Sequence, residues 1–135
     1  MADAYLLDTC TLVAAMKGEP RALLNRLAAL APTQLHLSGI ALSELMYGAA
    51  KSQRAAQVRA ALDVVTQGFV PLSFEATDAA AYGRIRAALE RKGTSIGPMD
   101  MLIAAQAVAH GLVLVTDNLR EFRRVPGLRC ENWAR

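Results

Sequence analysis

Short apolar runs alternate along the chain with longer stretches in which apolar residues recur every three or four positions. The runs at 4–7 and 112–116 are almost wholly apolar, as is typical of strands buried on both faces of a sheet. We predict five strands, at 4–7, 35–38, 69–72, 112–116 and 128–131. Because proline cannot donate a ladder hydrogen bond, Pro71 places the third of these at an edge of the sheet.

The longer stretches have the 3.6-residue period of amphipathic helices and end at glycine, proline or polar residues. We predict helices at 21–31, 40–50, 55–67, 75–92 and 98–110, and a helical turn at 11–16. In the last helix, Pro98 suits the first position and Gly111 suits the stop. Strands that alternate with helices indicate an α/β fold, a mainly parallel sheet of about five strands flanked by helices in one domain over residues 1–135.

Composition narrows the function classes. The chain is 53% hydrophobic but only 5% aromatic, so alanine, leucine and valine must build the core. Its formal net charge of +3 permits a polyanionic partner such as RNA without requiring one. Cys10 and Cys130 form no CxxC pair, which argues against a disulfide framework or zinc site and for a reducing compartment. With no signal peptide and no membrane-length apolar run, we expect a soluble, cytoplasmic protein.

Four carboxylates occupy related positions in the predicted fold. Asp8 and Asp117 each follow a buried strand, whereas Glu44 and Asp100 each lie on the apolar stripe of a helix. In a right-handed parallel sheet, all four can converge at the carboxyl edge of the strands, where ligands bind in such folds. Each acid also has a local explanation: Asp8 as a helix N-cap, Asp100 as a first-turn residue and Glu44 as a residue at the rim of the core.

Converging acids predict a metal site. Two unit charges about 4 Å apart repel by roughly 4 kcal/mol at an effective dielectric near 20, so such a cluster needs protons or a cation. Carboxylate oxygens favour Mg²⁺ or Mn²⁺, and such an ion can activate water and neutralise charge on a phosphodiester. Because the sequence pattern offers no nucleophilic side chain beside these acids, it indicates phosphoester hydrolysis.

Rival chemistries lack their required residues. A phosphoaspartyl phosphatase needs a second aspartate where this chain has Cys10, and a receiver domain needs a lysine after a late strand, where Asp117 stands. No glycine-rich loop follows Leu7, which excludes a Walker motif and a dinucleotide fingerprint. His36 and His110 have no partner at metal-ligand spacing, and we expect His110 to cap the end of its helix.

Six stretches in a fixed order resemble the PIN-domain ribonucleases, specifically the VapC-type toxins of bacterial toxin–antitoxin pairs. The resemblance covers essentially the whole chain, and the order and spacing of the motifs make it specific. The matching stretches are Leu6-Leu7-Asp8-Thr9, Ser43-Glu44-Leu45, residues 96–105 around Asp100, Leu114-Val115-Thr116-Asp117-Asn118 with Arg120-Glu121-Phe122, Val125-Pro126-Gly127-Leu128-Arg129 and Glu131-Asn132-Trp133.

The resemblance implies a PIN-like three-layer fold and a Mg²⁺-dependent endoribonuclease acting on structured RNA. The subgroup with this tail resembles enzymes that cut initiator tRNA in the anticodon stem-loop. Asp8, Glu44 and Asp100 match the three core acids of the family, with Asp8 and Asp100 as the direct metal ligands.

The resemblance leaves open which residue is the fourth acid of the site. The family often has an acid two residues after the threonine that corresponds to Thr116, and this chain has Asn118 there. Asp117 and Glu121 therefore compete for the fourth position. Thr116 matches the family's serine or threonine and would orient an acid or a water molecule.

The resemblance also implies partners: a homodimer, and a VapB-type antitoxin that blocks the acidic pocket with a C-terminal segment carrying a basic residue. Helices 20–31 and 40–50 are candidate surfaces for these contacts, although core packing explains the same residues. Basic residues at 84–92 and 120–124 either form solvated helix faces or hold RNA phosphates around the site. The alternative function is a PIN module that binds RNA or protein without cutting.

Overall fold

A five-stranded parallel sheet forms the centre of the protein. The computed structural model describes residues 2–134, and within them the strands lie in the order β3-β2-β1-β4-β5 with every neighbouring pair parallel. The predicted sheet is confirmed, and the strand that contains Pro71 lies at an edge as expected. The strands are β1 (Tyr5–Leu7), β2 (Leu35–Ser38), β3 (Val70–Leu72), β4 (Val113–Val115) and β5 (Cys130–Glu131).

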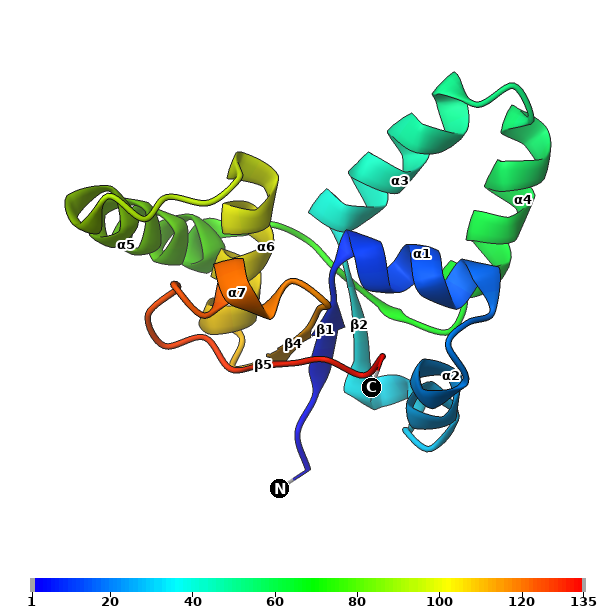
Figure 1. Ribbon diagram of the computed structural model, residues 1–135, viewed down its shortest axis with the longest axis horizontal. Coiled ribbons are helices and arrows are strands. Elements are labelled where there is room, and N and C mark those ends of the chain that lie inside the picture. Colours follow the sequence, from blue (N-terminus) through cyan, green and yellow to red (C-terminus); the bar gives the residue numbers. More distant parts are fainter. Residues whose placement is uncertain (1, 135) are drawn as a thin grey trace.

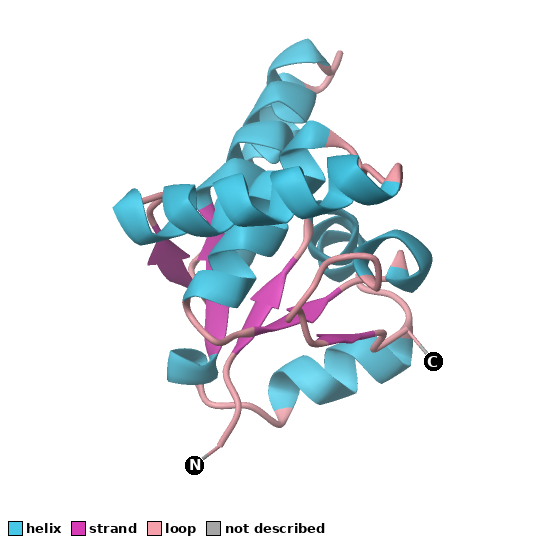
Figure 2. Cartoon of the chain, turned by 90° about the vertical axis from the view of Figure 1, so that its left-hand side faces the viewer, coloured by secondary structure: helices cyan, strands magenta, loops and turns pink. Residues whose placement is uncertain are grey.

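Helices cover the sheet on both faces. Figure 1 shows α5, α6 and α7 on one side of the strands and α1, α2 and α4 on the other, with α3 beyond the end of β2; Figure 2 shows the same strands from the side. The predicted α/β fold is therefore confirmed. The helices are α1 (Thr9–Lys17), α2 (Arg21–Ala28), α3 (Gly39–Lys51), α4 (Ala55–Thr66), α5 (Ala76–Lys92), α6 (Pro98–Ala109) and α7 (Leu119–Phe122), with a 3₁₀ turn at Pro32–Gln34.

Helix ends follow local capping chemistry, which corrects several predicted boundaries. The first helix begins at Thr9 and not at Thr11, because the Asp8 carboxylate accepts the backbone N–H of Thr11 and starts the helix two residues earlier. The second ends at Ala28, three residues before the predicted end at residue 31. The short helix α7 and the 3₁₀ turn were not predicted, because neither is long enough to show a helical period.

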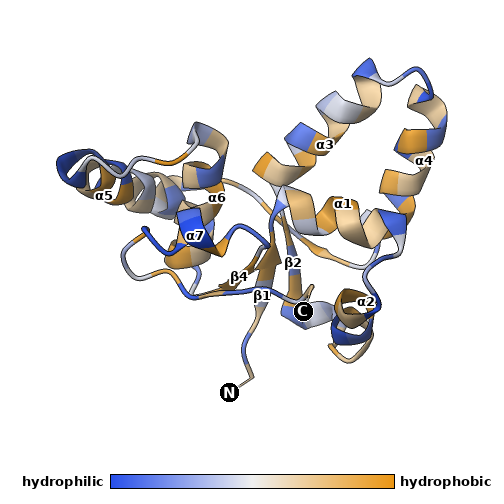
Figure 3. Ribbon diagram, viewed as in Figure 1, coloured by the Kyte–Doolittle hydropathy of each residue, from blue (hydrophilic) through white to orange (hydrophobic). Residues whose placement is uncertain are grey.

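The core is built from aliphatic strands and a helix rich in small residues. Leu6, Leu7 and Leu114 on the two central strands are fully buried, as are Ile103 and Ala104 on α6. Figure 3 shows the strands as apolar and the outer turns of α5 and α7 as largely polar. Because alanine keeps its side chain short, α6 packs close to the sheet, and this fixes where its first turn lies.

One fully buried carboxylate lies outside the acid group predicted from the sequence. Asp78 on α5 accepts the Glu75 backbone N–H at 2.7 Å, and its Oδ1 lies 2.8 Å from Nε2 of His110. His110 is the C-cap residue of α6, as predicted, with its backbone N–H donating to the Gln106 carbonyl, and its imidazole pairs with Asp78. This contact ties α5 to α6. None of the helices between residues 2 and 134 has the length and apolar character needed to span a membrane.

Candidate active site

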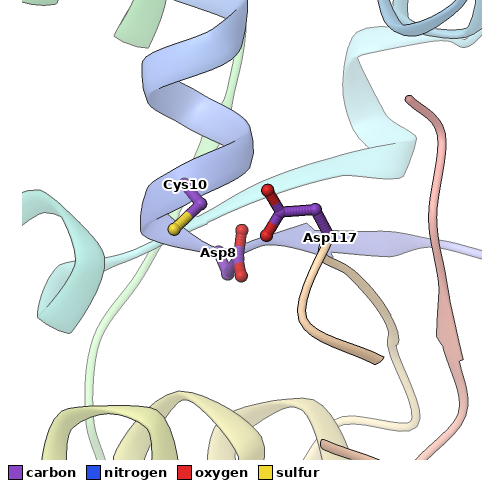
Figure 4. Close-up of side chains that lie close together, drawn as sticks. All are labelled: Asp8, Cys10 and Asp117. Atoms are coloured by element: carbon purple, nitrogen blue, oxygen red, sulfur yellow. The ribbon is translucent and has the colours of Figure 1, made fainter. Parts of the chain in front are cut away.

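The carboxyl edge of the sheet brings together side chains from the two ends of the chain. Asp8 follows β1 and Asp117 lies two residues beyond β4, and these strands pair directly, with Leu7 opposite Val115. Ligand atoms of Asp8, Cys10 and Asp117 all lie within 4.8 Å of one another (Figure 4). Within residues 2–134, no other group of three such side chains is this compact. The predicted meeting of Asp8 and Asp117 is therefore observed.

Asp8 is both a helix cap and a member of this cluster. Its side chain is buried, with 3% of the residue exposed, and it accepts the Thr11 backbone N–H at 2.9 Å. Burial raises the pKa of Asp8, while hydrogen bonds from Thr116 and Thr11 oppose the rise. The Thr11 hydroxyl also donates to the Val115 carbonyl at 3.0 Å, which ties α1 to β4. The local and functional interpretations of Asp8 are thus compatible.

Asp100 lies in the first turn of α6, where the field of the helix terminus alone would lower its pKa. Its pKa is instead raised to about 6, first by burial and then by the negative charges of Asp8, Glu121 and Glu44. The neighbouring acids and the loss of solvent therefore outweigh the helix dipole. A first-turn role alone does not account for Asp100, because the group senses three carboxylates from other elements.

Glu44 projects from α3 toward the same edge. The Thr9 hydroxyl, at the start of α1, donates a hydrogen bond of 2.7 Å to Glu44 Oε1. This contact joins residues 35 positions apart and orients the carboxylate. Glu44 is therefore held in place by a neighbouring helix and is more than an isolated rim residue. No sequence pattern indicates the Thr9 contact, since a threonine after an aspartate is equally explained as a helix start.

The two candidates for the fourth acid lie on different sides of the site. Asp117 is exposed and close to Asp8 and Cys10, whereas Glu121 on α7 is half-buried and acts on the charge of Asp100. The Asn118 side-chain amide donates to Glu121 Oε2 at 2.9 Å. Both acids are therefore at the site, and each approaches a different core aspartate.

Cys10 was missed as a site residue, and its thiol senses all the acids of the cluster. Burial and the negative charges of Asp8, Asp117, Asp100 and Glu44 raise the pKa of Cys10 to about 11. The thiol is therefore neutral near pH 7. The charges of all four carboxylates therefore reach a single sulfur atom at this edge of the sheet. The only feature of the sequence that could have indicated Cys10 is its position two residues after Asp8.

The donor set fits a hard divalent cation. The site offers carboxylate oxygens from two strand ends and two helices, and the repulsion that raises the pKa of Asp100 is what a bound cation would relieve. Neither histidine contributes. His36 lies on β2, where burial and the nearby His110 lower its pKa.

An apolar groove opens beside Glu44. It has a volume of about 540 Å³ and lies between α1, α3 and α4. Glu44 and Thr9 line the groove together with two cationic residues, Lys17 and Arg54. The remaining lining is mostly aliphatic: Val13, Met16, Leu45, Gly48, Ala49, Val58 and Ala61, with Gln57.

The chain is similar to a family of known proteins over nearly its full length. A family model described as PIN domain matches residues 5–128. A tRNA(fMet)-specific endonuclease VapC of Salmonella typhimurium is 40% identical over 130 residues, covering 96% of this chain and 98% of that protein. Ribonuclease VapC2 of Rickettsia felis is also 40% identical over 130 residues, covering 96% and 97%.

Solved structures agree with these similarities. A DNA-bound VapBC from Salmonella typhimurium contains a chain that matches with a TM-score of 0.93 and 39% identity, covering 98% of this chain and 99% of that one. VapBC2 from Rickettsia felis, bound to a DNA fragment from its promoter, matches with a TM-score of 0.91 and 39% identity, covering 96% and 98%.

Proposed function

The chain belongs to the PIN domain family, and from that membership we propose that it is a metal-dependent endoribonuclease, the toxin of a VapBC-type toxin–antitoxin pair. The observation that carries the proposal is the gathering of acids at the carboxyl edge of the sheet, where ligand atoms of Asp8 and Asp117 lie within 4.8 Å of each other. The charges of Asp8, Glu121 and Glu44 also raise the pKa of Asp100 there. Relatives named as ribonucleases, 40% identical over 130 residues, support the choice of RNA as substrate.

Mg²⁺ is the proposed cation, with Mn²⁺ as the close substitute. Asp8 and Asp100 would hold it directly, and Glu44 with Glu121 or Asp117 would complete the oxygen ligands. When bound, such an ion lowers the pKa of water and neutralises charge on a phosphodiester. The protein's own part is to hold the carboxylates: Thr116 and Thr11 donate to Asp8, and Thr9 donates to Glu44.

The proposed substrate is tRNA, in particular the anticodon stem-loop of initiator tRNA. Support comes from the Salmonella relative, which is named for tRNA(fMet) and aligns along 96% of this chain. Mapping RNA 5′ ends after a brief pulse of expression in cells tests this step. New ends confined to one tRNA loop would support it, whereas cleavage spread over messenger RNA would contradict it.

The proposed partner is a VapB-type antitoxin that occupies the groove between α1, α3 and α4. The groove is mostly aliphatic, and its polar lining includes Glu44 as well as the cations Lys17 and Arg54. An apolar segment with a basic side chain placed at Glu44 would fit it. Matching chains in VapBC complexes support such a partner. We propose in addition that the toxin is a homodimer. Because tRNA and an antitoxin meet in the cytoplasm, we place the activity there, in a single PIN domain spanning residues 1–135.

The decisive experiment replaces the core acids. We expect Asp8→Asn and Asp100→Asn each to reduce cleavage of total tRNA by at least about 100-fold, with EDTA abolishing cleavage by the wild-type protein and Mg²⁺ restoring it. A variant with Asn25→Ser, at an exposed position of α2, serves as the matched control. Cleavage that survives both acid substitutions would contradict the mechanism, and wild-type protein that binds RNA without cutting it would favour the non-cleaving binding module.

A further inference from the structure

We propose that Asn118 is a positioning residue that holds Glu121 in place at the acid site. The inference rests on the proposed function, because a held carboxylate matters only if the acids act together. It concerns the position where the sequence departs from the acid that the family often has. The structure gives this asparagine a specific partner, whose charge in turn acts on Asp100.

The first argument is a contact that Asn118 does not make. Asn118 is the N-cap residue of α7, a position where an asparagine side chain normally accepts a backbone N–H of the first turn. Here the side chain makes no such bond. Its Nδ2 donates instead to Glu121 Oε2 at 2.9 Å. The side chain therefore forgoes a cap worth about 1 kcal/mol and contacts an acid of the site.

The second argument is the chemistry of the donor. A neutral amide orients a carboxylate without cancelling its charge, whereas an arginine or lysine at this place would compete with a cation. The amide contacts one oxygen, Oε2, and leaves Oε1 of Glu121 without this contact. A carboxylate held by one oxygen can present the other to a metal ion, the usual division of roles around protein metal sites.

The third argument is that the asparagine is itself anchored. Its backbone N–H donates to the Thr116 hydroxyl at 2.9 Å, immediately beyond β4. The side chain is therefore aimed from a fixed backbone position. The Thr116 hydroxyl also bonds to Asp8, so a single short segment reaches both Asp8 and Glu121. Side-chain substitutions at position 118 leave the backbone contact in place and test the Glu121 contact alone.

The test uses Asn118→Ser in the full chain, because serine caps helices as well as asparagine does but is too short to reach Glu121. Isothermal titration calorimetry with Mn²⁺ alone measures metal affinity, and tRNA cleavage is separated into kcat and KM. We expect Mn²⁺ affinity to fall about tenfold and kcat to fall with little change in KM. The metal-free Tm should not fall, because serine is free to make the cap that Asn118 forgoes. Asn25→Ser on α2 should alter none of these quantities.

A double-mutant cycle decides whether Asn118 acts through Glu121. In a Glu121→Gln background, Asn118→Ser should cause no further loss of Mn²⁺ affinity, because the held carboxylate is already gone. An equal loss in both backgrounds would overturn the inference, as would unchanged Mn²⁺ affinity in the single variant. Failure of the wild-type protein to bind Mn²⁺ or to cut RNA would instead overturn the proposed function. Mn²⁺ binding and RNA cleavage by the wild-type protein are therefore measured before any variant is compared with it.

Discussion

At the scale of single residues, the acids of the site are held by uncharged hydrogen-bond donors. Thr9 holds Glu44, the Thr11 N–H holds Asp8, and each bond leaves the negative charge intact. A surface ion pair would have fixed the same groups only by neutralising them. The arrangement therefore keeps several charges close together in the folded protein, and their repulsion has a measurable effect on stability.

Asp100 should make metal-free stability depend on pH. Its pKa is raised from 3.8 to about 6, so the folded state binds the proton more tightly than the unfolded state. The stabilisation from protonation is complete below about pH 4 and is lost as the pH rises through about 6. We expect Asp100→Asn to raise the metal-free Tm by roughly 2–5 °C at pH 7 and hardly at all at pH 4.

Differential scanning calorimetry in EDTA between pH 4 and pH 7 measures this difference. Added Mg²⁺ should raise the Tm of the wild-type protein and have a much smaller effect on the variant. A Tm difference that is constant across the pH range would show that repulsion at Asp100 is not its cause.

The two candidates for the fourth acid should differ in metal affinity. Glu121 is half-buried and acts on Asp100, whereas Asp117 is exposed and better solvated. We expect Glu121→Gln to weaken Mn²⁺ binding by roughly tenfold or more, and Asp117→Asn to weaken it by less than about threefold. Calorimetric titration of both variants checks the order, and the reverse order would assign the fourth position to Asp117.

The acids could be predicted from the sequence, but the donors that hold them could not. Asp8 and Asp100 stand at strand and helix termini, which the apolar pattern reveals. The contacts of Thr9 and Asn118 depend on which rotamer reaches which oxygen, and no periodic pattern encodes that choice. For the same reason the sequence left Asp117 and Glu121 as equal alternatives.

At the scale of elements, a buried network joins the helices that carry two of the acids. The Ser38 hydroxyl oxygen accepts the Ile40 N–H at the start of α3, and the Ser38 side chain is hydrogen-bonded to the Gln106 amide oxygen on α6. Gln106 Nε2 donates to the Leu72 carbonyl of β3 at 3.2 Å. Gln106 therefore links α3, which carries Glu44, to α6, which carries both Gln106 and Asp100.

Removing this glutamine should destabilise the whole sheet region. Gln106 is fully buried, so Gln106→Ala leaves a cavity and two polar groups without partners. We expect the free energy of unfolding to fall by about 2–4 kcal/mol, measured by urea denaturation. Gln53→Ala, at an exposed turn, should change it by less than about 0.5 kcal/mol. Equal stability of the two variants would contradict a linking role for Gln106.

Element types were more predictable than element ends. The strands and the longer helices follow from periodicity, because their apolar faces must be buried. The early start of α1 depends on the Asp8 cap, and the four-residue helix α7 depends on tertiary contacts, with Phe122 buried beneath it. Such short helices owe their stability to packing, which a local pattern does not contain.

At the scale of the molecule, a mild positive charge meets an acidic pocket. Arg120 and Arg123 are exposed on and just after α7, the helix that carries Glu121. The neighbouring Arg124 is already bonded to the Ser95 carbonyl at 3.3 Å. Exposed cations next to an acid site can hold RNA phosphates on either side of the cleaved bond.

Charge reversal at these two positions should weaken RNA binding in a salt-dependent manner. We expect Arg120→Glu with Arg123→Glu to reduce tRNA affinity and to lower the slope of log affinity against log salt by about 1 per lost contact. Fluorescence anisotropy between 50 mM and 200 mM salt measures the slope. Arg21→Glu makes half of this change in net charge, on α2 across the sheet (Figure 1), and should leave the slope close to the wild-type value. An unchanged slope in the double variant would rule out these contacts.

The pairing of β1 with β4 also sets when the active site can exist during synthesis. The Thr11 hydroxyl donates to the carbonyl of Val115, 104 residues later in the chain, and Asp117 lies two residues beyond Val115. At translation rates of about 5–20 residues per second, the ribosome needs roughly 5–20 s to make the intervening segment. Throughout that interval the nascent chain contains Asp8 but lacks the strand that completes its surroundings. A growing polypeptide therefore cannot damage RNA near its own ribosome until β4 and Asp117 have been made.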